Sequence, residues 1–111
     1  MIKYIHTNTK ITFIPPFNES IDNYANLIEQ CDEIEFSNLI TKNGIKNYSP
    51  EFNQPITYLP DSIIKIVLCY TFNQYLYLPK FITHLSLGSK FNQNIEFPET
   101  LIFVKLFKPH I

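Results

Sequence analysis

The stretch FNQYLYLPKFITHLSLGSK, residues 72–90, decides the fold because the chain repeats its pattern on both sides. Its opening phrase, Phe-Asn-Gln from Phe72, also begins at Phe52 and at Phe91, which gives a period of 20 and then 19 residues. A period in this range is typical of solenoids, in which each coil buries its apolar side only against its neighbours. The sequence therefore predicts one coil for each repeat.

Each copy leads to a proline, and apolar residues follow that proline at the third, sixth and eighth positions. These nine residues are Ile63, Ile66 and Leu68, then Ile82, Leu85 and Leu87, and finally Leu101, Val104 and Leu106. The spacing is that of leucine-rich coils, where the last two positions alternate inward along a short strand. We therefore expect a strand-rich α/β fold, a leucine-rich-repeat-like right-handed solenoid with short parallel strands.

The repeated phrase also predicts two structural ladders, because equivalent positions of a solenoid stack at about the strand spacing of 4.7–4.9 Å. Phenylalanine rings would stack in the core, and buried asparagine amides beside them would bond the turning backbone of their own coil and the next. Unpaired groups there would cost about 1–3 kcal/mol each, which favours a structural role over a catalytic one. The expected ladder residues are Phe52, Asn53, Phe72, Asn73, Phe91 and Asn92.

Residues 1–50 predict a capping region and residues 51–108 three repeats, all within the single domain 1–111. Two alternating stretches, 2–6 and 10–14, predict a hairpin, and Phe17-Asn18 reads as a degenerate first copy of the repeat. One helix is expected at about 20–32, with Ser20 as its N-cap and an apolar stripe that includes Ile28. Residues 45–48 predict a short strand or turn.

Composition narrows the possible partners and compartments. The net charge is −1, and all nine basic side chains other than histidine are lysine, so we expect no nucleic-acid partner. Two cysteines, Cys31 and Cys69, are too few for a disulfide scaffold and predict free thiols in a reducing compartment. No stretch has the apolar length of a signal peptide or a membrane span. We therefore expect an intracellular, cytoplasmic protein with no membrane partner.

These motifs resemble the FNIP repeat, a relative of leucine-rich repeats named for its Phe-Asn-Ile/Gln-Pro core. The run from Phe52 to Ile56 is nearly the family's wording. Residues 59–63 and 78–85 match the second half of the motif, usually written L-P-x-S-[IL]-x-x-L. The third copy departs from it, because Asn94 stands in place of the proline and Phe97 in place of the leucine.

The resemblance covers residues 52 to about 108 and implies a protein–protein interaction scaffold with no enzymatic activity and no cofactor. Such repeats are typical of social amoebae and giant DNA viruses, and a viral member would work in the host cytoplasm. Some members carry an N-terminal F-box that connects them to ubiquitin ligases. Residues 1–50 instead predict two strands and one helix, which differ from that helical bundle.

Residue types that carry chemistry do not form a recognisable motif in this sequence. The histidines His6, His84 and His110 do not stand at metal-ligand spacing from each other or from a cysteine. The acidic residues between 29 and 35 are interpreted as a solvated face, and two glycines in the whole chain cannot form a phosphate loop. We therefore expect neither a catalytic nor a metal site, and a small enzyme is the least favoured function.

Strand alternation predicts a binding face, because residues between the inward positions would point to the concave side of the sheet. They are Lys65, Val67, Cys69, His84, Ser86, Gly88, Phe103, Lys105 and Phe107. Phe103 and Phe107 fit two interpretations equally, a contact anchor or a cover for the open C-terminal end. The unpaired edge of the last strand invites pairing, so a homodimer through this end is one hypothesis. A self-associating structural or assembly subunit is accordingly the alternative to an interaction module that binds another protein.

Overall fold

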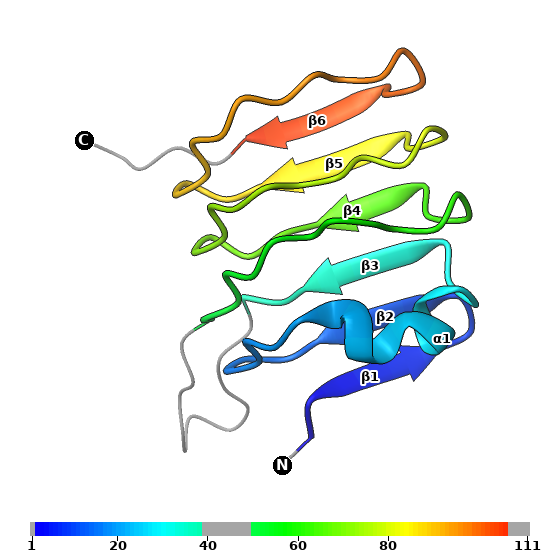
Figure 1. Cartoon of the computed structure of the whole chain (residues 1–111), viewed down its shortest axis with the longest axis vertical. Coiled ribbons are helices and arrows are strands. Elements are labelled where there is room, and N and C mark those ends of the chain that lie inside the picture. Colours follow the sequence, from blue (N-terminus) through cyan, green and yellow to red (C-terminus); the bar gives the residue numbers. More distant parts are fainter. Residues whose placement is uncertain (1, 39–49, 107–111) are drawn as a thin grey trace.

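A computed structural model describes residues 2–38 and 50–106, which form a strand-rich solenoid (Figure 1). One sheet holds the strands in sequence order, with β1 antiparallel to β2 and every later neighbour parallel. The strands are β1 (Tyr4–Thr7), β2 (Lys10–Phe13), β3 (Glu33–Phe36), β4 (Lys65–Val67), β5 (His84–Leu87) and β6 (Phe103–Leu106). The predicted strand or turn at 45–48 lies outside the described residues.

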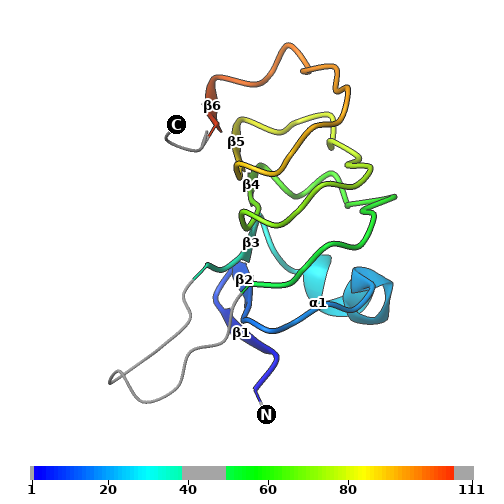
Figure 2. The same cartoon turned by 90° about the vertical axis from the view of Figure 1, so that its left-hand side faces the viewer.

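The sheet forms one side of the solenoid, and the return segments form the other (Figure 2). The predicted N-terminal hairpin is confirmed. It closes through a two-residue turn between Thr7 and Lys10, which face each other across the two strands. Asn8 occupies this turn with a φ of 51°, a conformation that asparagine tolerates better than most residues.

The helical segment is shorter than the predicted span of about 20–32. A 3₁₀ turn, η1 (Ile21–Tyr24), is followed directly by a four-residue helix, α1 (Ala25–Ile28). Ser20 caps the segment as expected, because its side chain accepts a hydrogen bond from the backbone N–H of Asp22 at 3.2 Å. Asp and Asn residues dominate the segment's polar side and favour turns over a long helix.

The expected stripe on the helical segment is nevertheless buried. Ile21, Ile28 and Cys31 belong to the core, and Tyr24 packs against it from the edge. After α1 the chain returns to the sheet, where the N–H groups of Asp32 and Glu33 both donate to the carbonyl of Thr9. These bonds begin β3 and explain why the helix ends before residue 32.

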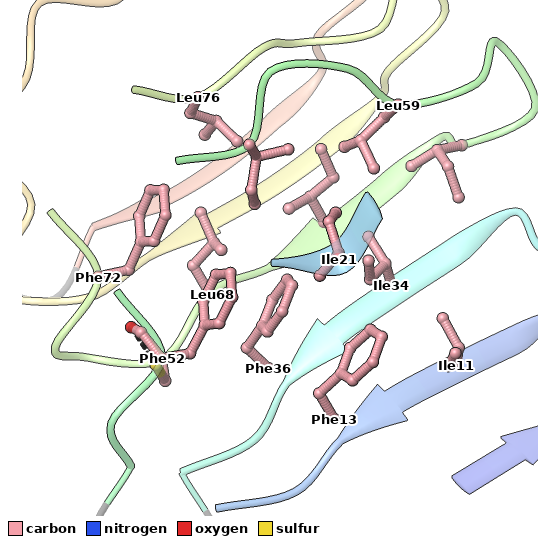
Figure 3. Packing of buried hydrophobic residues seen from close by; sticks show 14 of the residues in the cluster. Ile11, Phe13, Ile21, Ile34, Phe36, Phe52, Leu59, Leu68, Phe72 and Leu76 are labelled. Carbon is pink, nitrogen blue, oxygen red and sulfur yellow. Dashed lines mark hydrogen bonds between the residues drawn. The ribbon is translucent and has the colours of Figure 1, made fainter. Parts of the chain in front are cut away.

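The inward residues of neighbouring coils lie in register, as the repeat predicts. Ile34 pairs with Ile66, Ile66 with Leu85, and Leu85 with Val104. The side chains of Ile34, Ile66 and Leu85 fill the space between the sheet and the return segments, together with residues from β2 and η1 (Figure 3). All six inward residues of the first two repeats are buried, which are Ile63, Ile66, Leu68, Ile82, Leu85 and Leu87.

Phenylalanine rings form a continuous stack along one edge of this core. The ring of Phe52 lies 5.8 Å from that of Phe72 at an angle of 4°, and Phe72 lies 6.0 Å from Phe91 at 7°. Phe17 extends the stack at the N-terminal side, 5.9 Å from Phe52, so it occupies the place of a first copy. The centroid distances exceed the expected strand spacing, because the rings stack with an offset. Phe36, on β3, adds a further ring 4.0 Å from Phe52.

Asparagine side chains form a second ladder, which differs from the expectation in one respect. The Oδ1 atom of Asn18 accepts a hydrogen bond from the backbone N–H of Asn53 at 2.9 Å. In the same way, Asn53 Oδ1 accepts from the N–H of Asn73 at 2.8 Å. Asn73 Oδ1 accepts from the N–H of Asn92, also at 2.8 Å. Each amide thus bonds the backbone of the next coil. The side chains were expected to be buried, whereas Asn53 and Asn73 are half-buried and Asn18 and Asn92 exposed. The ladder runs along the turn outside the phenylalanine stack, where water reaches it.

Candidate functional site

The outer face of the sheet carries two rows of side chains across β4, β5 and β6. Lys65, His84 and Phe103 pair in register in one row, and Val67, Ser86 and Lys105 in the other. The first two members of each row are half-buried, and Phe103 and Lys105 are exposed. The structure therefore brings together six of the eight predicted face residues that it describes. Phe107 lies outside the described residues.

Two residues assigned to this face by alternation lie elsewhere. Cys69 is buried, with its Sγ atom 3.6 Å from the carbonyl oxygen of Phe52 and 3.3 Å from Thr71 Oγ1. Gly88 is also buried, and a Cβ atom placed on it would lie 2.2 Å from the Cα of Tyr70. Strand alternation fails at both positions because each follows the end of its strand, where the chain turns into the coil.

Ion pairs occupy the N-terminal half of the same outer face. Lys10 Nζ lies 3.2 Å from Glu33 Oε2 and 2.9 Å from Glu35 Oε1, and Lys65 Nζ lies 3.6 Å from Glu33 Oε2. The hydrogen bond to Glu35 raises the pKa of Lys10 above its ordinary value. The acidic residues between 29 and 35 were predicted to form a solvated face. Two of them, Glu33 and Glu35, instead form ion pairs with lysines across the sheet. Strand alternation could have predicted the position of Glu33 and Glu35 on the outer face, because they flank the inward-facing Ile34.

The C-terminal half of the face ends on an aromatic contact. The imidazole ring of His84 lies 5.6 Å from the ring of Phe103, and its Nδ1 atom lies 2.9 Å from Thr83 Oγ1. Thr83 Oγ1 also lies 3.1 Å from the carbonyl oxygen of Ile64, to which it donates. These contacts hold His84 against the sheet, so Phe103 is the more accessible side chain of the pair.

The C-terminal end of the solenoid is apolar, and no other part of residues 2–38 and 50–106 covers it. Val104 and Leu106 are 38% and 53% exposed, whereas Leu85 and Leu87 in the preceding coil are each 1% exposed. Leu101 and the ring of Phe91 are half-buried, although their equivalents in earlier coils are fully buried. The last coil thus places core residues at a surface. Within the described residues, no further coil lies against them.

The edge of β6 adds unpaired backbone groups to this surface. The N–H of Phe103 points back into the solenoid and donates to the carbonyl of Thr83. Since N–H groups alternate in direction along a strand, that of Val104 points outward. In the earlier coils, backbone groups that point toward the C-terminal end bond to the next coil. The N–H of Leu68, for example, donates to the carbonyl of Ser86. At β6, the last strand of the described sheet, these groups form an open edge.

Possible metal-ligating side chains are dispersed over the described residues. Nowhere in the described part of the chain do three His, Cys, Asp or Glu side chains group in a manner that could hold a metal ion. His6 lies on β1 and His84 on β5, whereas His110 lies outside the described residues. Within residues 2–38 and 50–106, no helix has the length and apolar character needed to cross a membrane.

Comparison of the chain with models of protein families, with curated proteins and with solved structures found no match. The arrangement of the strands by itself defines the class of protein, a β-solenoid with one short helical segment. Its most distinctive surface is the apolar C-terminal end, bordered by Phe103 on the outer face of the sheet.

Proposed function

We propose that this chain is a non-enzymatic protein–protein interaction module built on FNIP-type, leucine-rich-repeat-like coils. Its binding surface would be the uncovered C-terminal end together with the adjoining outer face at Phe103. The observation that carries this proposal is the exposure of Val104 and Leu106, whose equivalents Leu85 and Leu87 are buried. Contiguous apolar side chains at a surface mark interaction sites, because covering them removes apolar area from water.

The aromatic side chain beside this end suits a contact anchor. Phe103 is half exposed on the outer face and is supported from below by the ring of His84. Aromatic residues on rigid elements contribute strongly to interfaces, because they bury a large area with few rotatable bonds. The free thiols of Cys31 and Cys69 are consistent with a role in the cytoplasm, where disulfides are rare.

The experiment compares partner capture by three forms of the chain from cells of its source. Leu106→Lys places a charge on the exposed end, and Ile5→Lys is the matched control, because Ile5 is similarly exposed on β1 at the opposite end. We expect a partner that the wild type and Ile5→Lys retain and Leu106→Lys loses. Equal capture by all three forms would contradict binding through the end, and circular dichroism would establish that both variants fold.

A second candidate function, a self-associating structural or assembly subunit, is favoured by the open edge of β6. Sheet edges of this kind pair readily with another strand. This function predicts that the purified chain associates without any other protein. Measurement of its mass at several concentrations would distinguish the two functions, because the module bound to a different partner would stay monomeric alone.

A further inference from the structure

The two ends of the solenoid differ in whether their core residues are covered. At the N-terminal end, Ile11 and Phe13 are buried, and the rings of Tyr4 and Tyr24 pack within 6.2 Å and 5.4 Å of Phe13. The antiparallel strand β1 lies over that end as a cap. At the C-terminal end β6 is the last strand of the described residues, and all four of its residues are exposed. Among the described residues, therefore, a strand covers the core at the N-terminal end and none covers it at the C-terminal end.

We propose that a second copy of this chain covers the C-terminal end, with the two β6 strands paired antiparallel across a two-fold axis at Val104. The proposal rests on the second candidate function, self-association, because it names a second copy as the partner of the end and fixes how the two copies meet. Contact of C-terminal end with C-terminal end buries both uncovered surfaces. Head-to-tail contact would instead leave one uncovered end at the tip of every assembly, and closed two-fold dimers are the commonest oligomers.

The backbone of β6 is complementary to itself in this arrangement. The N–H of Phe103 bonds back to Thr83, and the backbone groups of a strand alternate in direction, so the N–H and the C=O of Val104 both point outward. Across a two-fold axis, Val104 of each copy donates to and accepts from Val104 of the other. This pair of bonds is the normal closed unit of an antiparallel ladder. The described sheet would then continue through the interface.

The side chains select this register over the next one. With Val104 on the axis, Phe103 of each copy faces Lys105 of the second copy on the outer face, where an ammonium group beside an aromatic ring is favourable. Moving the axis to Lys105 would place two ammonium groups directly opposite each other. Val104 and Leu106 remain on the core side in the proposed register, so the two apolar ends meet.

The charges of the last coil do not oppose this contact. Between residues 88 and 106 the coil carries two lysines and two glutamates, Lys90, Lys105, Glu96 and Glu99. Two such ends have no net like charge to repel each other. The core-facing side chains of β6 include no charged residue that would block edge pairing.

The test measures the mass of the full chain by sedimentation equilibrium from low to high micromolar concentration. We expect a monomer–dimer equilibrium for the wild type. Val104→Pro removes the outward N–H at an edge position where proline is tolerated, and Val104→Ala is its matched control, because alanine keeps that N–H while also shortening the side chain. The dissociation constant of Val104→Pro should exceed that of Val104→Ala at least tenfold. Thermal unfolding of both variants at low concentration would establish that the monomer remains folded.

A cysteine scan tests the register independently. Paired residues on the axis lie about 5.5 Å apart at Cα, within the range that a disulfide spans. Val104→Cys should therefore form a covalent dimer under mild oxidation at least tenfold faster than Lys105→Cys. The wild type is the control, because its two cysteines are buried.

The outcomes separate this proposal from the proposed function. A wild-type chain that stays monomeric at high micromolar concentration overturns the dimer, and so does an assembly that grows beyond two copies. Equal dissociation constants for the proline and alanine variants also overturn it, as does faster cross-linking through Lys105→Cys. A different result would contradict the proposal that the chain is an interaction module. That result is equal capture of partners by Leu106→Lys and by its control, Ile5→Lys.

Discussion

Single side chains at the turns of this solenoid connect one coil to the next. Asn73 Oδ1 accepts hydrogen bonds from the backbone N–H of Asn92 at 2.8 Å and from Gln93 Nε2 at 3.0 Å. Its own N–H is satisfied by Asn53. The residue therefore works as an acceptor for the following coil. Removal of its side chain would leave the N–H of Asn92 without this acceptor, whereas Gln93 Nε2 would keep its bond to the carbonyl oxygen of Asn73 at 3.3 Å.

Asn73→Ala should lower the free energy of unfolding by about 0.5–1.5 kcal/mol, because it removes hydrogen bonds between two coils at a turn that water reaches. Asn92→Ala is the control, since its Oδ1 accepts no hydrogen bond among the described residues and its loss should change little. Urea unfolding of both variants measures the difference. Similar stabilities for the two variants would show that the asparagine ladder contributes nothing.

Gly88 is required by the close approach of two coils, because its missing Cβ would lie 2.2 Å from the Cα of Tyr70. Gly88→Ala should destabilise the chain by about 1–3 kcal/mol or more, since backbone must shift to make room. Ser89→Ala, at the next position, should have a much smaller effect. Thermal unfolding distinguishes them, and a Gly88→Ala variant as stable as the wild type would rule out this packing constraint.

The thiol of Cys31 should react slowly in the folded chain. Burial raises its pKa, and the nearby Asp32 carboxylate adds to the effect. A raised pKa means that folding favours the neutral thiol, so this contribution is present below the unfolded pKa and is lost as pH rises through the folded pKa. Alkylation at pH 8 should be fast in denaturant and slow without it. Equal rates in both conditions would contradict the burial of this residue.

At the scale of elements, the helical segment depends on its cap more than on its length. It contains one 3₁₀ turn and one α-helical turn, and a segment this short has little intrinsic stability. Ser20→Ala should lower the free energy of unfolding by about 1 kcal/mol through loss of the bond to Asp22. Asn23→Ala, at an exposed position of the same segment, is the control. A loss no larger than the control's would mean that the cap is unimportant.

The sequence predicted the repeated elements better than the unique ones. Strand register and the phenylalanine stack follow from the period, because each copy constrains the others. The helix was predicted too long, since its apolar stripe continues to Cys31 although the chain already turns at Ile28. Gly88 and Cys69 were misplaced because alternation holds within a strand and stops where the strand does.

The candidate site was partly accessible to the same reasoning. The outer rows containing Lys65 and His84 follow from alternation, and their neighbours in register follow from the period. The ion pairs of Lys10 with Glu33 and Glu35 depend on which strands are adjacent, and that adjacency links residues more than 20 positions apart in sequence. How exposed the last coil is could be determined only from the three-dimensional structure.

At the scale of the whole molecule, stability should decrease from the middle coils toward the C-terminal end. Each coil contacts mainly its neighbours, and the last one has a neighbour on one side only within the described chain. Amide hydrogen exchange at low concentration should show strong protection in β3 and β4 and weak protection in β6. Equal protection in all the strands would indicate that the solenoid opens as one cooperative unit.

The one-way direction of the asparagine bonds has a consequence for how such a chain can change in length. Asn53 and Asn73 each accept a hydrogen bond from the coil after them and donate their own backbone N–H to the coil before them. The junction before residues 72–90 is therefore chemically like the junction after them. A duplicated copy of this 19-residue unit would meet matching surfaces on both sides. Gene duplication within the repeat could therefore lengthen the protein in steps of one coil without redesign of the N-terminal cap.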